Sequence, residues 1–134
     1  MDNLSIKQRK FCMSKIRSRN TKPEIVVRRI LTEIGLRYRL HNIRLHGKPD
    51  IIISKLKTIF FVNGCFWHRH RGCKKSTTPK TNIEYWEKKL ERNVEKQAGD
   101  IRALRNEGWK VYIIWECEIK DENKLNKKII KIFR

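Results

Sequence analysis

The sequence of 134 residues has no long hydrophobic run, no internal repeat and no low-complexity linker. A membrane-spanning helix needs about 18 consecutive apolar residues, and no segment supplies them. Residues 1–10 are polar and lack the apolar core of a secretory signal peptide. We therefore expect a cytoplasmic protein without membrane partners, in a reducing compartment where disulfides are rare.

Acidic side chains are scarce beside basic ones. Only 14 aspartates and glutamates oppose 33 lysines and arginines, which gives a formal net charge of +19. The basic residues run along the whole chain, and a field of this sign attracts polyanions. Nucleic acid is therefore the expected partner, and the alternative is a ribosomal-type or merely soluble basic protein.

Hydrophobic spacing predicts one α/β domain over residues 21–134, preceded by a basic arm over residues 1–20. A capping box of Thr21 and Glu24 predicts a helix that ends at Gly35. A short strand near residues 38–40 and a hairpin of apolar runs at 51–53 and 59–62 should follow. A long amphipathic helix is expected over residues 82–107, with its apolar stripe at Ile83, Trp86, Leu90, Val94, Ile101 and Leu104. A buried strand at 111–115 and a helix over 121–133 complete a mixed sheet with helices.

Soft metal ligands gather in one short segment. Cys65, His70 and Cys73 lie close in sequence, and Cys117 follows the strand predicted at 111–115. Thiolate and neutral imidazole are the ligands zinc prefers, and four of them complete a tetrahedral structural site. In a reduced compartment this spacing favours a metal site over disulfides. The alternative is that Cys65 and Cys117 are small buried hydrophobic residues and that the loop after Cys65 is simply basic.

Two adjacent large aromatics, Phe66 and Trp67, lie inside this polar and cationic segment. Such a pair is poorly suited to solvent unless it inserts into something. The segment therefore offers a metal site together with a hydrophobic wedge.

A candidate catalytic carboxylate, Asp50, follows Pro49 where the predicted strand 51–53 begins. Phosphodiester hydrolysis needs a divalent ion, and a carboxylate at the edge of a sheet is a hard oxygen ligand for Mg²⁺. Ordinary turn chemistry also explains an aspartate beside a proline. His68, which remains a free imidazole if Cys65 and His70 bind zinc, strengthens the catalytic interpretation.

Four motifs occur in a fixed order between about Ser14 and Cys117. They are Thr21-Lys22-Pro23-Glu24, Gly47-Lys48-Pro49-Asp50-Ile51, Phe61-Val62-Asn63-Gly64-Cys65-Phe66-Trp67-His68, and Gly108-Trp109 through Trp115-Glu116-Cys117. Together they closely resemble the motifs of the very-short-patch-repair (Vsr) DNA mismatch endonucleases. The resemblance implies a restriction-endonuclease-like, PD-(D/E)XK-type three-layer α/β fold with a central mixed sheet and a structural zinc. It also implies Mg²⁺-dependent nicking of one strand, 5′ to the thymine of a T:G mismatch left by deamination of 5-methylcytosine.

The resemblance also implies roles for individual residues. Asp50 would hold Mg²⁺ with the backbone carbonyl of Val62, and His68 would act as general base or position the water. Glu24 would support the water shell of the metal, although its capping position alone explains a glutamate there. The zinc ligands would be Cys65, His70, Cys73 and Cys117.

The remaining implied roles concern DNA contact. Phe66, Trp67 and Trp86 would form a wedge that opens the base stack, while Met13 on the arm would enter from the opposite groove. Trp86 also fits the apolar stripe of the long helix, so a core role is the alternative. We expect the protein to act on mismatched double-stranded DNA as a monomer.

Three features depart from the family pattern. Asn63 stands where the family usually has a histidine; as a member of the catalytic set it can hydrogen-bond a phosphate oxygen but cannot carry a proton. Arg71 and Gly72 separate His70 from Cys73 by two residues, where one is expected, and the chain has no Glu-x-Lys partner on the second strand. Two alternatives stay open, a zinc-stapled DNA-binding module without catalysis and a nuclease with changed specificity.

Overall fold

The computed structural model describes residues 21–42, 44–74 and 79–133. The expected basic arm, including Met13, lies outside these residues. The elements in chain order are α2 (Lys22–Glu33), β1 (Arg39–Leu40), β2 (Ile51–Ile53), the 3-10 turn η1 (Ser54–Leu56), β3 (Thr58–Asn63), α3 (Ile83–Asn106), β4 (Lys110–Trp115), the 3-10 turn η3 (Glu116–Lys120) and α4 (Glu122–Ile132). None of the helices described combines the length and apolar character of a membrane span.

The four strands form one mixed sheet in the order β1-β2-β3-β4. β2 pairs antiparallel with both β1 and β3, whereas β3 and β4 are parallel. The predicted hairpin and the mixed sheet are therefore confirmed. The register sets Asn63 opposite Trp115, so the segments that follow β3 and β4 leave the sheet at the same edge.

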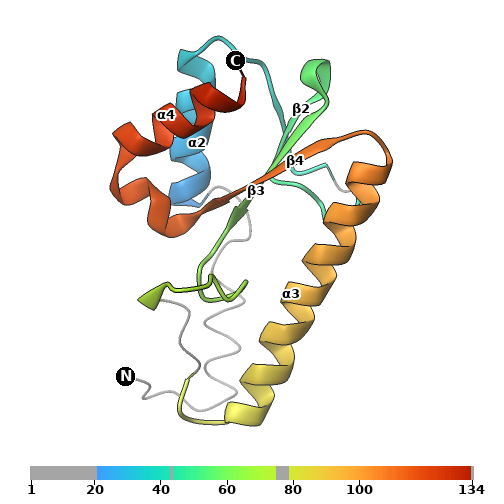
Figure 1. Cartoon of the computed structure of the whole chain (residues 1–134), viewed down its shortest axis with the longest axis vertical. Helices are drawn as coiled ribbons and strands as arrows, with labels where there is room; N and C mark the ends of the chain where they lie inside the picture. The colour runs from blue at the N-terminus through green and yellow to red at the C-terminus, as the bar shows by residue number, and fades with distance from the viewer. Residues whose placement is uncertain (1–20, 43, 75–78, 134) are drawn as a thin grey trace.

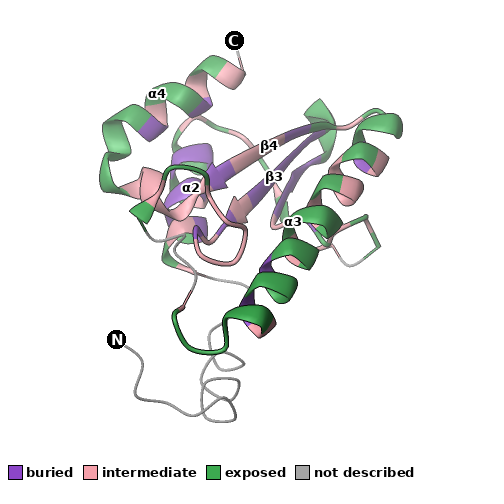
Figure 2. Cartoon of the chain, turned by 60° about the horizontal axis from the view of Figure 1, so that its bottom comes forward, coloured by how far each residue is buried: buried purple, intermediate pink, exposed green. Residues whose placement is uncertain are grey.

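Helices cover both faces of the sheet (Figure 1), with α2 and α4 on one side and α3 on the other. Successive strand residues point to opposite faces, so the apolar runs of β2 and β3 contribute to two cores. Figure 2 shows that most residues of these central strands are buried. The core under α2 and α4 contains Val26, Val27, Ile30, Leu31, Ile51, Ile53, Phe60, Ile114, Leu125 and Ile129. The core under α3 contains Ile52, Ile59, Phe61, Leu104 and Val111.

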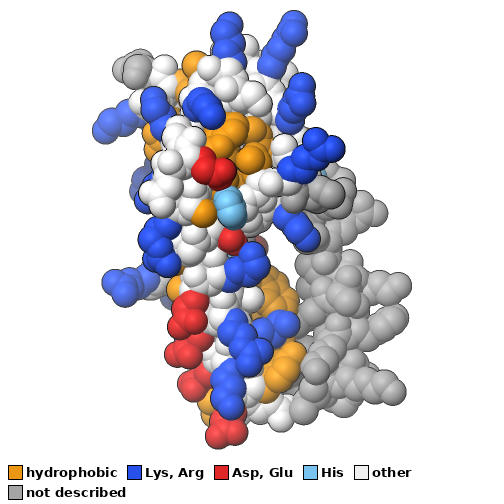
Figure 3. All heavy atoms as spheres, turned by 90° about the vertical axis from the view of Figure 1, so that its right-hand side faces the viewer, with side chains coloured by type: hydrophobic (Ala, Val, Ile, Leu, Met, Phe, Trp, Pro, Cys, Tyr) orange, Lys and Arg blue, Asp and Glu red, His pale blue; other side chains and the backbone are white. Residues whose placement is uncertain are grey.

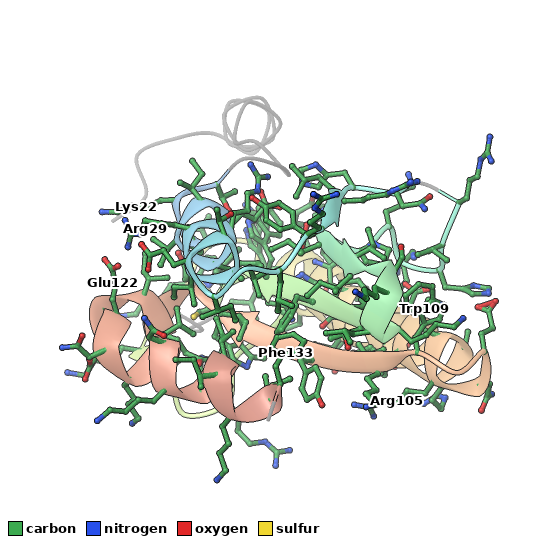
Figure 4. All side chains as sticks on the ribbon, turned by 90° about the horizontal axis from the view of Figure 1, so that it is seen from above. Lys22, Arg29, Arg105, Trp109, Glu122 and Phe133 are labelled. Carbon is green, nitrogen blue, oxygen red and sulfur yellow. The ribbon has the colours of Figure 1, made fainter. Side chains whose placement is uncertain are left out.

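The first helix begins and ends as its sequence predicts. The Thr21 hydroxyl accepts from the Glu24 N–H, and the Glu24 carboxylate accepts from the Thr21 N–H, which completes the capping box. Gly35 follows the last turn with φ +85°, a conformation that favours glycine. An ion pair between Arg29 of α2 and Glu122 of α4 joins the two helices of this layer (Figure 4).

The apolar stripe predicted for α3 is only partly buried. Trp86, Leu90 and Leu104 are buried, but Ile83 and Val94 are 49% and 40% exposed, so their expected inward position is wrong. The reason lies in the arrangement of the helix. Only its C-terminal part lies against the strands, and the N-terminal part extends past them (Figure 1), so the sheet does not cover the flank of the stripe there.

Candidate metal centre and active site

The four expected soft ligands meet beyond the shared edge of β3 and β4. The ligand atoms of Cys65, His70, Cys73 and Cys117 all lie within 4.8 Å of one another. The Nδ1 atom of His70 is 3.5 Å from the Cys65 sulfur and 3.4 Å from the Cys117 sulfur. Because β3 and β4 are parallel, Cys117 after β4 lies near Cys65 after β3. The His70 N–H donates to the Cys65 carbonyl and the Cys73 N–H donates to the His70 carbonyl, and these bonds fold the loop around the cluster. This cysteine cluster could hold one metal ion.

Burial controls the protonation of the Cys65 thiol. Burial, together with the neighbouring Cys117 and Cys73 thiols, raises the pKa of the Cys65 thiol to about 12. A thiolate at Cys65 near neutral pH therefore requires a nearby positive charge, which a metal ion would supply.

Groups around the cluster hold its ligands in place. The Glu116 carboxylate accepts from the Cys65 N–H at 3.0 Å. The His70 ring stacks on Trp115, with centroids 4.1 Å apart and planes inclined by 8°. Such outer contacts fix the orientation of metal ligands.

A second group of possible ligands lies at the amino end of β2. Glu24, His41 and Asp50 bring their ligand atoms within 4.8 Å of one another. Glu24 projects from the first turn of α2, His41 follows β1, and Asp50 precedes β2. This acidic group combines two carboxylates and an imidazole, a set that could hold a divalent cation.

Hydrogen bonds fix the carboxylates of the acidic group. Asp50 Oδ2 accepts from the Val62 N–H at 2.7 Å, which ties Asp50 to β3. Glu24, 1% exposed, accepts from the Thr21 N–H with one oxygen and lies 2.8 Å from His41 Nε2 with the other. Glu24 therefore caps α2 and contributes to the acidic group at once, the two roles that its position allowed.

Burial disfavours the ionised form of the Asp50 carboxyl group when no cation is bound. Burial is the main cause that raises the pKa of Asp50, to about 8, and the negative charge and hydrogen bond of Glu24 add to it. The Val62 N–H and the Arg28 guanidinium lower the same pKa without offsetting burial. A nearby cation stabilises the ionised form of such a buried carboxyl group and can take the place of its proton.

His41 is the member of the acidic group that sequence reasoning missed. Its backbone N–H donates to the Asp50 carbonyl at 3.2 Å, and its φ of +48° lies in the left-handed region that non-glycine residues rarely adopt. The signal that could have found it is strand pairing. Leu40 lies opposite Ile51, so the next residue along β1 must face Asp50.

His68 lies in neither group of possible metal ligands among the described residues. Its Nδ1 atom is buried and finds no hydrogen-bond partner within the part of the chain that the structure describes. Burial lowers the pKa of His68, so the neutral imidazole is favoured at pH values where a free histidine would begin to take up a proton.

Three aromatic rings pack beside the cysteine cluster. Phe66 meets Trp67 edge-on at 5.3 Å between centroids, and Trp86 of α3 lies 5.6 Å from Phe66 and 6.2 Å from Trp67. Phe66 and Trp67 are half-buried, whereas Trp86 is only 3% exposed. In this aromatic cluster Trp86 forms the buried base, and the two loop aromatics retain exposed surface.

The Asn63 side chain is buried against α3. The residue is 2% exposed, and its side chain faces Gln97 of α3. Asn63 Nδ2 donates to Gln97 Oε1 at 2.7 Å, and Gln97 Nε2 donates to Asn63 Oδ1 at 2.8 Å. Nothing in the sequence singled out Gln97 from the other polar residues of α3.

Positive charge surrounds α3 on the face shown in Figure 3. Lys and Arg side chains spread over much of this face, while acidic side chains gather along one edge of its lower half. The exposed glutamates of the N-terminal part of α3 recur at helical spacing and are Glu84, Glu87, Glu91 and Glu95. Most acidic side chains of the N-terminal half of α3 thus form one stripe, and the many Lys and Arg side chains around it have the sign that attracts polyanions.

The chain is similar to several known DNA endonucleases. Residues 1–75 match the family model described as DNA mismatch endonuclease Vsr. The type II nicking enzyme V.XorIIP of Xanthomonas oryzae pv. oryzae is 41% identical over 131 residues, 98% of this chain and 96% of that protein. The type II nicking enzyme V.NmeAIP of Neisseria meningitidis serogroup A is 40% identical over 99% of this chain and 94% of its own length.

Two further comparisons extend the similarity. The DNA mismatch endonuclease Vsr of Escherichia coli K12 is 37% identical over 84% of this chain and 72% of that protein. Among solved structures, the homing endonuclease I-Bth0305I catalytic domain superposes with a TM-score of 0.50 at 24% identity, covering 84% of this chain and 93% of that one. The predicted α/β fold of the restriction-endonuclease-like class is thus confirmed.

Proposed function

Because the chain belongs to the Vsr family of DNA mismatch endonucleases, we propose that it nicks one strand of double-stranded DNA 5′ to the thymine of a T:G mismatch. The reaction is a Mg²⁺-dependent hydrolysis of one phosphodiester bond, carried out by a cytoplasmic monomer. The observation that carries the proposal is the acidic group of Glu24, His41 and Asp50, which adjoins the strand that leads into the aromatic cluster.

Asp50 is the principal ligand of the catalytic metal in this proposal. Carboxylate oxygens suit Mg²⁺, and a carboxyl group whose pKa is about 8 gains from a cation that replaces its proton. Val62 faces Asp50 through its N–H, and the N–H and C=O of one strand residue point toward the same neighbouring strand. Its carbonyl is therefore a suitable second ligand. When bound, Mg²⁺ would polarise the phosphate and neutralise developing charge.

Glu24 and His41 support Asp50 in this proposal and do not compete with it for the metal. Both carboxylate oxygens of Glu24 already have partners, Thr21 and His41. We assign Glu24 to the water shell of the metal, with its orientation fixed by the capping box and by His41.

His68 is the general base or the residue that positions the attacking water. An imidazole must be neutral before it can accept a proton. Burial lowers the pKa of His68 and so favours its neutral form. The hydrogen bond from the His68 N–H to the Gly64 carbonyl holds its backbone in the loop that also carries Phe66 and Trp67.

We assign zinc to the cysteine cluster. Three sulfurs and one imidazole nitrogen, all within 4.8 Å of one another, form a donor set typical of structural zinc. The zinc would hold residues 65–73 against the ends of β3 and β4.

Phe66 and Trp67 are the side chains that enter the DNA in this proposal. Both are half-buried and rest on buried Trp86, so they can change neighbours with little rearrangement of the core. Unstacking a base step costs a few kcal/mol and is least costly at a mispair. Trp86 acts as their support, and Met13, outside the described residues, remains the proposed contact from the opposite groove.

The test is a nicking assay on duplexes that contain each mismatch, with both strands labelled and zinc-loaded protein. We expect Mg²⁺-dependent cleavage of the T-containing strand of T:G duplexes, 5′ to the thymine, and no cleavage by Asp50→Asn. Cleavage centred on another mismatch would identify a nuclease of changed specificity. Mismatch binding without cleavage under any divalent cation would identify a DNA-binding module without catalysis.

A further inference from the structure

One face of α3 contacts the segment 63–67. Three side chains of this face make the contacts, and they are spaced by seven and four residues, so they lie one above the other. Trp86 packs against the rings of Phe66 and Trp67. Asn93 Nδ2 donates to the Trp67 carbonyl at 3.2 Å, and Gln97 pairs with Asn63.

The Gln97–Asn63 amide pair is the most specific of these contacts. Each amide donates one hydrogen bond and accepts one, at 2.7 and 2.8 Å, across 34 residues of sequence. Asn63 is 2% exposed, so water cannot easily replace these bonds. Because a buried amide left without partners is costly, the pair fixes where the end of β3 lies relative to α3.

Asn63 stands between the two sites of the molecule. The preceding residue, Val62, donates its N–H to Asp50 of the acidic group. Two residues after Asn63, Cys65 enters the cysteine cluster and donates its N–H to Glu116. A shift of Asn63 would therefore move Val62 relative to Asp50 and would move the loop that carries Phe66, Trp67 and His68.

We propose that Gln97 is a positioning residue for the nicking reaction and that it acts through Asn63. The pair sets the relative placement of the acidic group and the loop that bears the aromatic wedge. This inference rests on the proposed function, and it assigns Asn63 to positioning rather than to contact with a phosphate. A small misplacement of reacting groups typically costs roughly 10- to 100-fold in rate, and we expect a loss of this size when the pair is broken.

The experiment is a double-mutant cycle under single-turnover conditions on the best substrate from the mismatch panel. Gln97→Ala, Asn63→Ala and the double variant are compared with the parent, each below its own melting temperature. Glu95→Ala is the matched control, because Glu95 lies on the same helix and is exposed. The three pair variants should lose similar rate, and the control should keep the parent rate. Coupling of this kind shows that the residues act as a unit.

Rescue separates positioning from general stability. The exchanged pair, Asn63→Gln with Gln97→Asn, can restore both hydrogen bonds and should recover part of the rate. Gln97→Glu keeps the acceptor for Asn63 Nδ2 and should give an intermediate rate, which covers the case in which Gln97→Ala does not fold. The loss should lie in kcat, and affinity for matched DNA should stay unchanged.

A readout independent of cleavage tests the pair itself. In ¹⁵N spectra of the parent, the side-chain amide protons of Asn63 and Gln97 should exchange slowly with solvent, and Gln97→Ala should make those of Asn63 exchange rapidly. A parent that nicks no mismatch but shows the protected amides would overturn the proposed function and leave the pair established. Parent-rate nicking by Gln97→Ala, or losses that simply add in the double variant, would overturn the inference.

Discussion

Asp50 of the acidic group should make the magnesium-free protein less stable as the pH rises. The pKa of Asp50 is about 8 in the folded protein, against 3.8 for a free aspartate side chain. Between these values the folded protein keeps a proton that the unfolded chain has lost. The stabilising contribution of this proton is therefore complete below about pH 4, and it disappears as the pH rises through about 8.

The magnitude follows from the same linkage. Each pH unit within this window changes the free energy of unfolding by up to about 1.4 kcal/mol, so the fall between about pH 5 and pH 8 can reach roughly 4 kcal/mol. This is an upper limit, because Asp50 is only partly buried and water can screen it. In the proposed function Mg²⁺ binds the ionised carboxylate, so adding it should restore stability at the alkaline end by mass action.

The assay is urea unfolding followed by tryptophan fluorescence, at several pH values, without added divalent cations and with the zinc retained. Asp50→Asn is the control, because asparagine has nearly the same shape and does not ionise. Subtracting its free energy of unfolding from that of the parent cancels the titration of all distant groups. This difference in the free energy of unfolding should fall as the pH rises. Saturating Mg²⁺ should stabilise the parent at high pH, so that the fall disappears, and should not affect Asp50→Asn. A difference that stays constant, or that grows with pH, would refute the argument.

The remaining predictions concern the cluster, the wedge and the amide pair. The protein should contain about one zinc per chain, and Cys117→Ser should lower zinc content and melting temperature together; unchanged zinc content, measured by elemental analysis, would exclude this ligand set. Trp67→Ala should remove roughly 1 to 3 kcal/mol of stacking and lower kcat/KM on T:G duplexes without changing weak binding to matched DNA; equal losses on both would show that Trp67 serves the core. Asn63→His should lower kcat, because histidine cannot reproduce both bonds to Gln97; an increase would show that the pair is dispensable and that an imidazole is the limiting group.

Local patterns predicted most of the fold because each depends on neighbouring residues. The capping box of Thr21 and Glu24 marks the start of α2 by hydrogen bonds three residues apart. The apolar runs at 51–53 and 59–62 can only be buried between two helical layers. Once β3 and β4 are parallel, residues after their carboxyl ends must meet, and the convergence of Cys65 and Cys117 follows from topology alone.

Polar contacts between distant segments could not be read in the same way. His41 joins Glu24 only because β1 pairs with β2 in one register, and a slip of one residue would turn it away. The contact between Asn63 and Gln97 has no periodic signature, since glutamine is an ordinary residue on a polar helix face. The exposure of Ile83 and Val94 likewise depends on how far α3 extends past the sheet, which spacing within the helix does not encode.

The loop between β3 and α3 shows why these contacts are needed together. Over residues 64–74, Cys65 is the one buried side chain, so hydrophobic burial alone provides little to order the segment. A wedge that enters DNA must nevertheless be rigid beforehand, because ordering it during binding would consume the free energy gained from stacking. The cysteine cluster, the stacking of His70 on Trp115 and the polar face of α3 hold the loop from different directions. In the proposed function, metal coordination and hydrogen bonds order this loop, and the surfaces of Phe66 and Trp67 stay available for the DNA.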